Sequence, residues 1–330
     1  MKIAICLSCF NGQEYLSQQI DSILVQSVTD WQLFIRDDGS SDNSPLIIKE
    51  YEKMDSRIHF VNSDNTGPSK ETLHLLKQAD KDHLSPKKIK AIRIHRSFYE
   101  LTKSVNADFY FFSDQDDIWK KNKLSLFLAV ADKKNQNVPA MYYSDLSVVA
   151  NDLNVIKESM HQEGQTLLEN LVGNEVIGCA TMFNKALADN WIYDYNGLYN
   201  SLHDSYLALL SLSIGELIFI RESTVYYRQH ENNVIGDKKK SNWAADFWDM
   251  IINSQTRADY ISKSFSTSSL LDATNHNTLE DFANLSKKSF KQRYKLLTEY
   301  PYKRSSKVQT TLLRLLLLSN IFKPSTALKN

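Results

Sequence analysis

Cysteines and long apolar runs are scarce in this sequence of 330 residues. The three cysteines, Cys6, Cys9 and Cys179, provide neither an even disulfide set nor the spacing of a metal site, which fits a reduced cytosolic protein. The mean hydropathy of −0.40 excludes a polytopic membrane protein. No cleavage-like site follows the apolar N-terminus, so we expect a first strand there and not a signal peptide.

Two phosphate-binding motifs are also absent. The sequence contains no GxGxxG and no GxxxxGK followed by Ser or Thr, which excludes a Rossmann dinucleotide fingerprint and a Walker loop. Any bound phosphate would therefore have to be met by a metal ion. Apolar side chains make up 42% of the chain, enough to form the core of one large domain or of two smaller ones.

The net charge of zero conceals an uneven distribution. Residues 287–330 contain eleven basic side chains and one acidic side chain, Glu299, and so carry +10, while the rest of the chain carries −10. A basic segment on an acidic body suggests a polyanionic partner, either phospholipid or nucleic acid. No recognised nucleic-acid-binding fold accompanies the basic residues, so we expect no nucleic-acid partner.

The apolar pattern predicts a doubly wound α/β fold. Apolar runs at 2–9, 31–36 and 57–61 indicate strands, and helical periodicity follows Tyr15 and covers 45–54. This alternation of strands and helices is typical of a mostly parallel sheet flanked by helices. Beyond about residue 241 the pattern is helical only.

Polar clusters follow three of the predicted strands, at Ser8–Glu14, Asp37–Asp42 and Asp114–Asp117. Ligands gather at the carboxyl ends of parallel strands, so these clusters are the first indication of a functional site. Asp114 and Asp116 would point the same way at a strand end, where a divalent cation would relieve their repulsion. Alternatively, these acids only cap the helix expected at 118–130, and Asp37–Asp42 is only a turn and a cap.

Two later residues have similar alternatives. Asp204 is either a first-turn acid that favours the helix dipole or a general base near a reacting hydroxyl. His230 is either an ordinary surface or core histidine or a ligand of a metal or phosphate.

Taken in chain order, these motifs resemble the family 2 glycosyltransferases, and most of all their rhamnosyltransferase-like bacterial branch. The resemblance covers about residues 2–236 and rests on these segments: Ser8-Cys9-Phe10-Asn11-Gly12, Arg36-Asp37-Asp38-Gly39-Ser40-Ser41-Asp42, Asn65-Thr66-Gly67, Phe112-Ser113-Asp114-Gln115-Asp116-Asp117-Ile118-Trp119, Gly178 with Met182-Phe183-Asn184, His203-Asp204, and Arg228-Gln229-His230-Glu231-Asn232-Asn233. It implies a GT-A fold and an inverting, metal-dependent transfer of one sugar, rhamnose or another hexose, from a nucleotide-sugar.

The resemblance also implies a role for each matching residue. The nucleotide-sugar would be held by Ser8, Phe10, Asn11, Asp37, Asp38 and Asp114. Manganese or magnesium would be bound by Asp116 and Asp114, with His230 reaching the metal or the diphosphate. Asp204 takes the place of the catalytic base, and the acceptor side would include Gly178, His203 and Trp119.

The resemblance sets the expected domains. A GT-A domain would cover 1–240, with a nucleotide-sugar half at 1–118 and an acceptor half at 119–240, followed by a basic helical region at 241–330. A basic insert at 69–96 departs from the family pattern and is either an acceptor-binding or partner-binding flap or a plain helix pair. The QxxRW motif is absent, which favours single-sugar addition over processive synthesis.

The acceptor would be a cell-surface glycan, linked to lipid or to protein. Two rival functions are a catalytically silent subunit of the same fold and a nucleotidylyltransferase, although the latter would want basic residues after the first strand and 11–17 has none. The Leu-rich segment 310–322 would either lie on an anionic membrane, with Leu312, Leu313, Leu316 and Leu317 toward the lipid, or pack on Trp243, Phe247 and Trp248 or in a homodimer. We expect a cytoplasmic protein, peripheral to the membrane in the first case.

Overall fold

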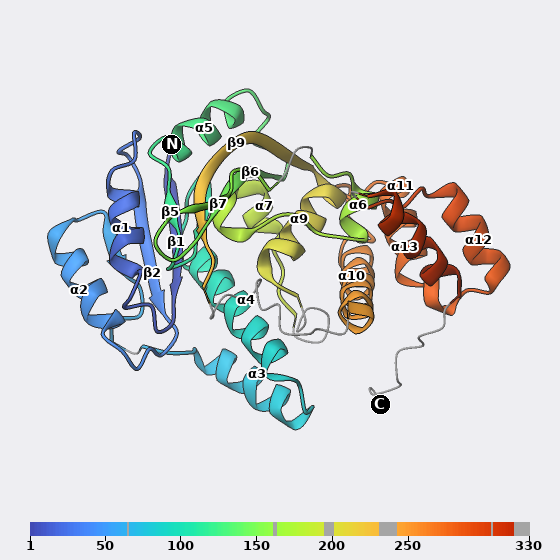
Figure 1. Cartoon of the computed structure of the whole chain (residues 1–330), viewed down its shortest axis with the longest axis horizontal. Coiled ribbons are helices and arrows are strands. Elements are labelled where there is room, and N and C mark those ends of the chain that lie inside the picture. Colours follow the sequence, from blue (N-terminus) through green and yellow to red (C-terminus); the bar gives the residue numbers. More distant parts are fainter. Residues whose placement is uncertain (65, 161–163, 195–200, 231–242, 305, 320–330) are drawn as a thin grey trace.

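A mixed β-sheet with helices on both faces forms the body of the protein (Figure 1). The computed structural model describes residues 1–64, 66–160, 164–194, 201–230, 243–304 and 306–319. Its strands have the spatial order β3-β2-β1-β4-β8-β6-β9-β5, and β7 pairs with β6. Their bounds are β1 Ile3–Cys9, β2 Gln32–Asp37, β3 Ile58–Phe60, β4 Phe109–Ser113, β5 Ile118–Trp119, β6 Ala140–Val149, β7 Val155–Lys157, β8 Thr181–Asn184 and β9 Glu216–Arg228.

The first half of the sheet is parallel, as the sequence predicted. Strands β3, β2, β1 and β4 pair in parallel, so the carboxyl ends of these strands lie at one edge. Side chains of β1 alternate between two cores: Ile5 and Leu7 lie in one, and Ala4 and Cys6 lie in the other. A strand buried on both faces needs a continuous apolar run, and for this reason the run at 2–9 predicts a strand.

Helices of the first 131 residues cover both faces of this parallel half. The core that contains Ile5 also contains residues of α1, α2 and α5, while the core that contains Ala4 contains residues of α4. Their bounds are α1 Leu16–Leu24, α2 Ser44–Met54, α3 Lys70–Lys81, α4 Pro86–Ser104 and α5 Lys123–Ala131. The expected helix at 118–130 thus begins only at Lys123, because Ile118 and Trp119 pair with β9.

The second half of the sheet mixes parallel and antiparallel pairs. Strand β8 pairs antiparallel with both β4 and β6, whereas β6 and β9 are parallel. The helical elements here are α6 Leu167–Leu171, η1 Gly178–Ala180, α7 Lys185–Asn190 and α9 His203–Ile214. The register of β6 against β9 shifts between Ser144 and Asp145 and again between Asp145 and Ser147.

The C-terminal region is helical, as expected, and shares its core with the sheet domain. Its elements are α10 Trp243–Ser264, α11 Ala273–Ala283, η2 Leu285–Lys287, α12 Phe290–Glu299 and α13 Lys307–Ser319. Ile251 and Ala258 of α10 lie in the same buried cluster as Leu207 and Leu210 of α9. The expected boundary at 240 lies outside the described residues, but the apolar core continues across it.

The Leu-rich helix is partly a core helix. Leu313 and Leu317 are 0% and 4% exposed and lie in one buried cluster with Leu296 and Leu297 of α12. The expectation that these two leucines face lipid is therefore wrong, while Leu312 remains exposed. Among the described residues, no helix is long and apolar enough to cross a membrane.

Candidate active site

The ends of β1, β2 and β4 meet at the carboxyl edge of the parallel strands. The amide of Gln115, just after β4, holds the loop after β1: its Oε1 accepts from the Phe10 N–H at 2.7 Å and its Nε2 donates to the Phe10 carbonyl at 3.0 Å. A Cβ at Gly12 would lie 2.6 Å from the same Oε1, so only glycine leaves room for this clamp. Gln115 therefore joins the first and third polar clusters of the sequence.

The second polar cluster is a turn with a fixed shape. The Asp37 carboxylate is buried and accepts hydrogen bonds from the Gly39 and Ser40 N–H groups at 3.0 and 2.9 Å. Asn11, with a positive φ of 51°, donates its N–H to the Ser40 hydroxyl at 2.8 Å. Asp37 thus orders the turn, because one carboxylate oxygen accepts from the Gly39 and Ser40 N–H groups and the other from the Ser40 hydroxyl.

Asp38 lies within that turn and beside two arginines. Its carboxylate, 9% exposed, lies 3.4 Å from Nε of Arg36, and burial raises its pKa to about 6 although Arg36 and Arg93 oppose the rise. Arg93 donates to the Asp38 carbonyl at 2.6 Å, and its guanidinium carbon lies 4.5 Å from the ring centroid of Phe10. The Ser8 hydroxyl donates to Ser97 at 2.8 Å.

Arg93 and Ser97 both belong to α4, the second helix of the basic insert region. The insert therefore forms one wall of the site that holds Ser8, Phe10 and Asp38. The sequence showed only a basic stretch here and gave no signal that Arg93 would reach the strand ends.

The third cluster brings three carboxylates together. Burial and the charges of Asp117, Asp116 and Asp204 raise the pKa of Asp114 well above its ordinary value, and burial and Asp116 raise that of Asp117 to about 7. Oδ1 of Asp117 accepts from the Arg228 N–H at 3.1 Å, while its buried Oδ2 has no nitrogen or oxygen donor among the described residues. The raised pKa values indicate that the surrounding residues only partly stabilise negative charge on these carboxyl groups.

The end of β9 approaches the same cluster. His230 Nε2 lies 2.8 Å from Oδ2 of Asp116, so the two residues expected at a metal are adjacent. Arg228 Nε donates to the Asp116 carbonyl at 2.9 Å and fixes this loop. The rest of the motif, Glu231-Asn232-Asn233, lies outside the described residues.

These residues fit a hard divalent cation. Oxygen ligands from Asp114, Asp116 and Asp117 with an imidazole from His230 are a donor set that magnesium or manganese accepts, and Oδ2 of Asp117, which has no nitrogen or oxygen donor among the described residues, is available as a ligand. Ligand atoms of Asp114, Asp117 and Cys179 also lie within 4.8 Å of one another. Burial and the nearby acids raise the pKa of the Cys179 thiol, so it stays protonated and ligates poorly.

Lys123 is a buried residue of the site that the sequence did not reveal. Burial lowers its pKa to about 7, although Asp117 and Asp114 oppose this, and its ammonium donates to the Cys179 carbonyl. The ammonium also lies 3.8 Å from the ring centroid of Trp119. Trp119 is 2% exposed and packs in the core, so the expectation that it faces the acceptor is not supported.

Asp204 lies in the first turn of α9 with a fixed carboxylate. Its Oδ2 accepts from the Gly178 N–H at 3.1 Å and its Oδ1 from the Ser205 N–H at 2.6 Å. Burial raises its pKa, and the charge of Arg257 opposes this. The charge of Asp204 also raises the pKa of Asp114, so the expected base and the metal cluster face one site.

The neighbouring His203 belongs to the wall behind the site. It is 4% exposed, its ring centroid lies 4.1 Å from that of Phe98, and burial keeps its pKa well below its ordinary value. A Cβ at Gly178 would lie 2.8 Å from its Nε2, which explains the glycine there. His203 therefore packs in the core and does not present its ring to an acceptor, contrary to expectation.

Arg257 extends the site into the C-terminal helices. This residue of α10 is 7% exposed, and burial lowers its pKa to about 10 while the charge of Asp204 opposes this. It donates to the Ser201 hydroxyl at 3.4 Å, and its Nε has no acceptor among the described residues. In the sequence Arg257 looks like any basic residue of a long helix.

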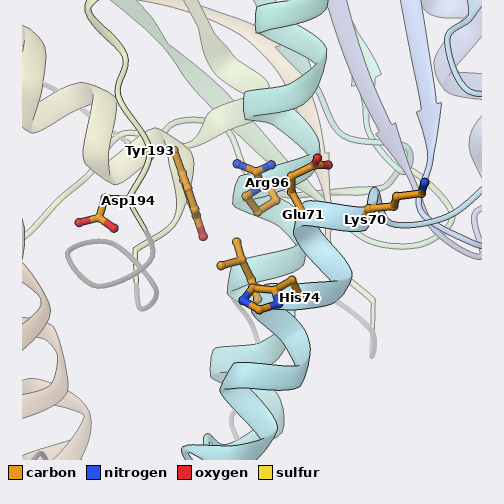
Figure 2. A pocket seen from close by; sticks show the side chains of 7 residues that line it. Lys70, Glu71, His74, Arg96, Tyr193 and Asp194 are labelled. Carbon is orange, nitrogen blue, oxygen red and sulfur yellow. The ribbon is translucent and has the colours of Figure 1, made fainter.

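An open cleft of about 520 Å³ lies between the insert and the segment before α9 (Figure 2). It is lined by Lys70, Glu71, His74, Leu75, Arg96, Tyr193 and Asp194. The Arg96 guanidinium carbon lies 4.9 Å from the ring centroid of Tyr193, so α4 and the 191–194 segment are in contact at its floor.

Comparison with known proteins points to one family. The sequence model named Glycosyl transferase family 2 matches residues 4–85, which include β1, the turn after β2 and the first helix of the insert. Over these residues the chain is similar to family 2 glycosyltransferases, the family expected from the order of the motifs.

Two proteins of similar sequence are bacterial glycosyltransferases. The putative teichuronic acid biosynthesis glycosyltransferase TuaG of Bacillus subtilis is 25% identical over 54% of this chain and 60% of its own length. The dTDP-rhamnosyl transferase RfbG of Shigella flexneri is 28% identical over 70% of this chain and 73% of its own length. The match thus spans less than two thirds of the first of these relatives.

Solved structures support the GT-A type of fold. A crystal structure of S. aureus TarS 1–349 has a TM-score of 0.55 at 13% identity and covers 97% of this chain and 80% of its own. The structure of TarS 1–349 in complex with UDP-GlcNAc has a TM-score of 0.54 at 15% identity, covering 97% and 87%. At these identities the likeness concerns the fold alone.

Proposed function

We propose that the protein transfers one sugar from a nucleotide-sugar to a glycan acceptor, with inversion and with a divalent metal. One observation carries the proposal: a buried carboxylate, Asp204, faces a cluster of under-neutralised carboxylates at Asp114, Asp116 and Asp117. A base opposite a cation-binding cluster is the arrangement that displacement of a nucleoside diphosphate requires.

Asp114, Asp116, Asp117 and His230 would hold manganese or magnesium. When bound, the metal supplies positive charge that stabilises the departing diphosphate. The chain itself supplies Arg228, which holds the loop of Asp116, and Gln115, which holds that loop against Phe10. These contacts fix the position of the metal ligands relative to Phe10, where the nucleotide would bind.

The nucleoside would bind where β1 and β2 end. Phe10 is 45% exposed and offers a ring face, and Asp38 offers a carboxylate that can accept from a base N–H or a ribose hydroxyl. Ser8 lies near the end of β1, Asn11 lies in the loop that follows it, and Asp37 shapes the turn that positions Asp38. RfbG is named for dTDP-rhamnose and a TarS structure holds UDP-GlcNAc, so rhamnose or another hexose on a pyrimidine nucleotide is the proposed donor.

Asp204 would act as the general base. Its carboxylate takes the proton of an acceptor hydroxyl while the hydroxyl oxygen forms a bond to the anomeric carbon and the bond to the diphosphate oxygen breaks on the opposite face. Hydrogen bonds from the Gly178 and Ser205 N–H groups hold one lone pair of each oxygen and fix the direction of the other. A buried carboxylate with a raised pKa is a better proton acceptor than an exposed aspartate.

The acceptor would approach through the cleft of Figure 2. Tyr193 offers an aromatic ring, while Glu71 and Asp194 offer carboxylates that accept from sugar hydroxyls. A volume of about 520 Å³ lies within the range of ligand sites and suits a short glycan. Lipid-linked or protein-linked cell-surface glycan is the proposed acceptor class.

The test combines donor binding with turnover. A panel of nucleotide-sugars would be added with and without manganese, and stabilisation would be followed by thermal unfolding, because a ligand that binds only the folded state raises its stability. Asp116→Asn should lose the manganese-dependent stabilisation. Asp204→Asn should keep it and lower turnover by about 10² to 10⁴, the range that a positioned base contributes.

Asp189→Asn serves as the matched control, since this carboxylate is 59% exposed on α7 outside the site. If Asp116→Asn keeps the manganese-dependent thermal stabilisation, the metal site is refuted, and the acidic cluster only caps the following helix. A wild-type protein that binds the donor but transfers no sugar to any acceptor or water would favour the silent-subunit alternative.

A further inference from the structure

Helix α12 lies at the end of the molecule farthest from α2 and is rigidly held (Figure 1). Ser289 and Gln292 close its first turn with a capping box. The buried Arg293 donates from NH1 to the Lys288 carbonyl at 2.6 Å and from Nε to the Leu318 carbonyl at 3.1 Å, tying α12 to α13. Its orientation, and hence the face it shows to solvent, is fixed by these contacts.

The outward face of α12 combines aromatic rings with lysines. Phe290 and Tyr294 are 62% and 58% exposed and lie one turn apart, so they form a stripe along the helix. Lys291 and Lys295, also exposed, form the adjacent stripe. No ion pair involves either lysine among the described residues.

This combination matches the chemistry of a lipid–water boundary. Aromatic side chains settle at the headgroup level of a bilayer, and lysines beside them are attracted to anionic headgroups. The neighbouring α13 adds a second exposed apolar stripe, because Val308, Leu312 and Leu315 are 79%, 39% and 59% exposed at a spacing of four and three residues.

The charges favour a bilayer over a second copy of the chain. A two-fold contact through this face would bring Lys291 and Lys295 of both copies together without an acid to pair them. The surrounding segment 287–330 carries +10. A soluble polyanion would satisfy the lysines but would leave Phe290 and Tyr294 in water.

We propose that α12 docks the protein on an anionic phospholipid surface, with Phe290 and Tyr294 at the headgroup level and Lys291 and Lys295 against the phosphates. This inference goes beyond the proposed transfer reaction and does not rest on it. It also excludes Leu313 and Leu317 as lipid contacts, since both are buried, and makes α12 the main contact.

The experiment uses the full chain and two kinds of vesicle, one of phosphatidylcholine and one of phosphatidylcholine mixed with phosphatidylglycerol. The bound fraction is measured by co-sedimentation at low and high salt. We expect binding only to the anionic vesicles, weakening as salt screens the lysines. The pair Phe290→Ser with Tyr294→Ser, and separately the pair Lys291→Glu with Lys295→Glu, should each weaken binding by about tenfold or more.

The matched control is the pair Leu46→Ser with Met54→Ser on α2, where the two side chains are 61% and 77% exposed at the opposite end of the molecule. This pair should bind as the wild type does. Wild-type protein that ignores anionic vesicles at low salt, or α12 variants that bind normally, would overturn the proposal. A wild-type dimer that dissociates in the α12 variants would assign the face to a second copy.

All variants alter exposed side chains, so unfolding temperatures should stay close to that of the wild type. Donor hydrolysis by water, measured without vesicles, should also be unchanged in the α12 variants. Failure of the lipid assay with intact hydrolysis would therefore reject the docking face and leave the proposed reaction standing.

Discussion

Replacing Arg257 by methionine should separate stability from catalysis. Burial lowers the pKa of this arginine from 12.5 to about 10, which corresponds to about 3 kcal/mol of unfavourable free energy in the folded state. Because the lowered pKa still lies far above neutrality, this cost is present throughout the physiological range and is relieved only above about pH 10. Arg257→Met removes the buried cation and should raise the free energy of unfolding, by at most about 3 kcal/mol, less the hydrogen bond to Ser201 and the lost attraction to the buried Asp204.

Catalysis should change in the opposite direction. The charge of Arg257 lowers the pKa of Asp204, so its removal raises that pKa further. A larger fraction of Asp204 is then protonated near neutral pH and cannot take the acceptor's proton. The acidic limb of the profile of kcat/KM against pH should move to higher pH, activity should recover as the pH rises, and Arg257→Lys should restore much of the wild-type profile.

Urea unfolding and the pH profile of sugar transfer are the two measurements. Arg304→Met is the matched control, because Arg304 is also a partly buried arginine of the C-terminal region but donates to the Val172 carbonyl and has no charge contact with Asp204. An unshifted acidic limb in Arg257→Met would refute the electrostatic argument. A fall in stability with a proportional fall in activity would make Arg257 a purely structural residue.

Two further predictions concern the core and the cleft. Leu313→Ala should lower the free energy of unfolding, measured with urea, by about 2 to 5 kcal/mol, because Leu313 is 0% exposed. Leu315→Ala is the control: this position is 59% exposed, so the change should be about 0.5 kcal/mol or less. Tyr193→Ala should raise KM for the acceptor by about tenfold through loss of the ring while leaving donor-dependent thermal stabilisation unchanged; a normal acceptor KM would place the acceptor elsewhere.

The parallel half of the fold was predictable because its signals are local. Strand β1 is buried on both faces, so its apolar run is unbroken, and polar residues follow it directly where the site begins. The acidic cluster was visible for the same reason, as Asp114 follows the end of β4. What the sequence could not show is how the charge is distributed around these ends.

Arg93, Lys123 and Arg257 reach the site from helices that are distant in the sequence. Each lies in a helical pattern where a basic residue normally faces water, and only tertiary packing turns it inward. His203 and Trp119 failed in the opposite way. Their motif positions suggested contact with an acceptor, but aromatic neighbours and strand pairing bury them in the core.

The order of the strands has a consequence for how the protein is made. Among the described strands, β5 pairs with β9 alone, and the Arg228 N–H at the end of β9 donates to Asp117, more than a hundred residues earlier in the chain. Contacts of such long sequence separation form slowly, because loop closure must precede them. A nascent chain should therefore complete the parallel strands early but complete its acidic cluster only after Arg228 has left the ribosome.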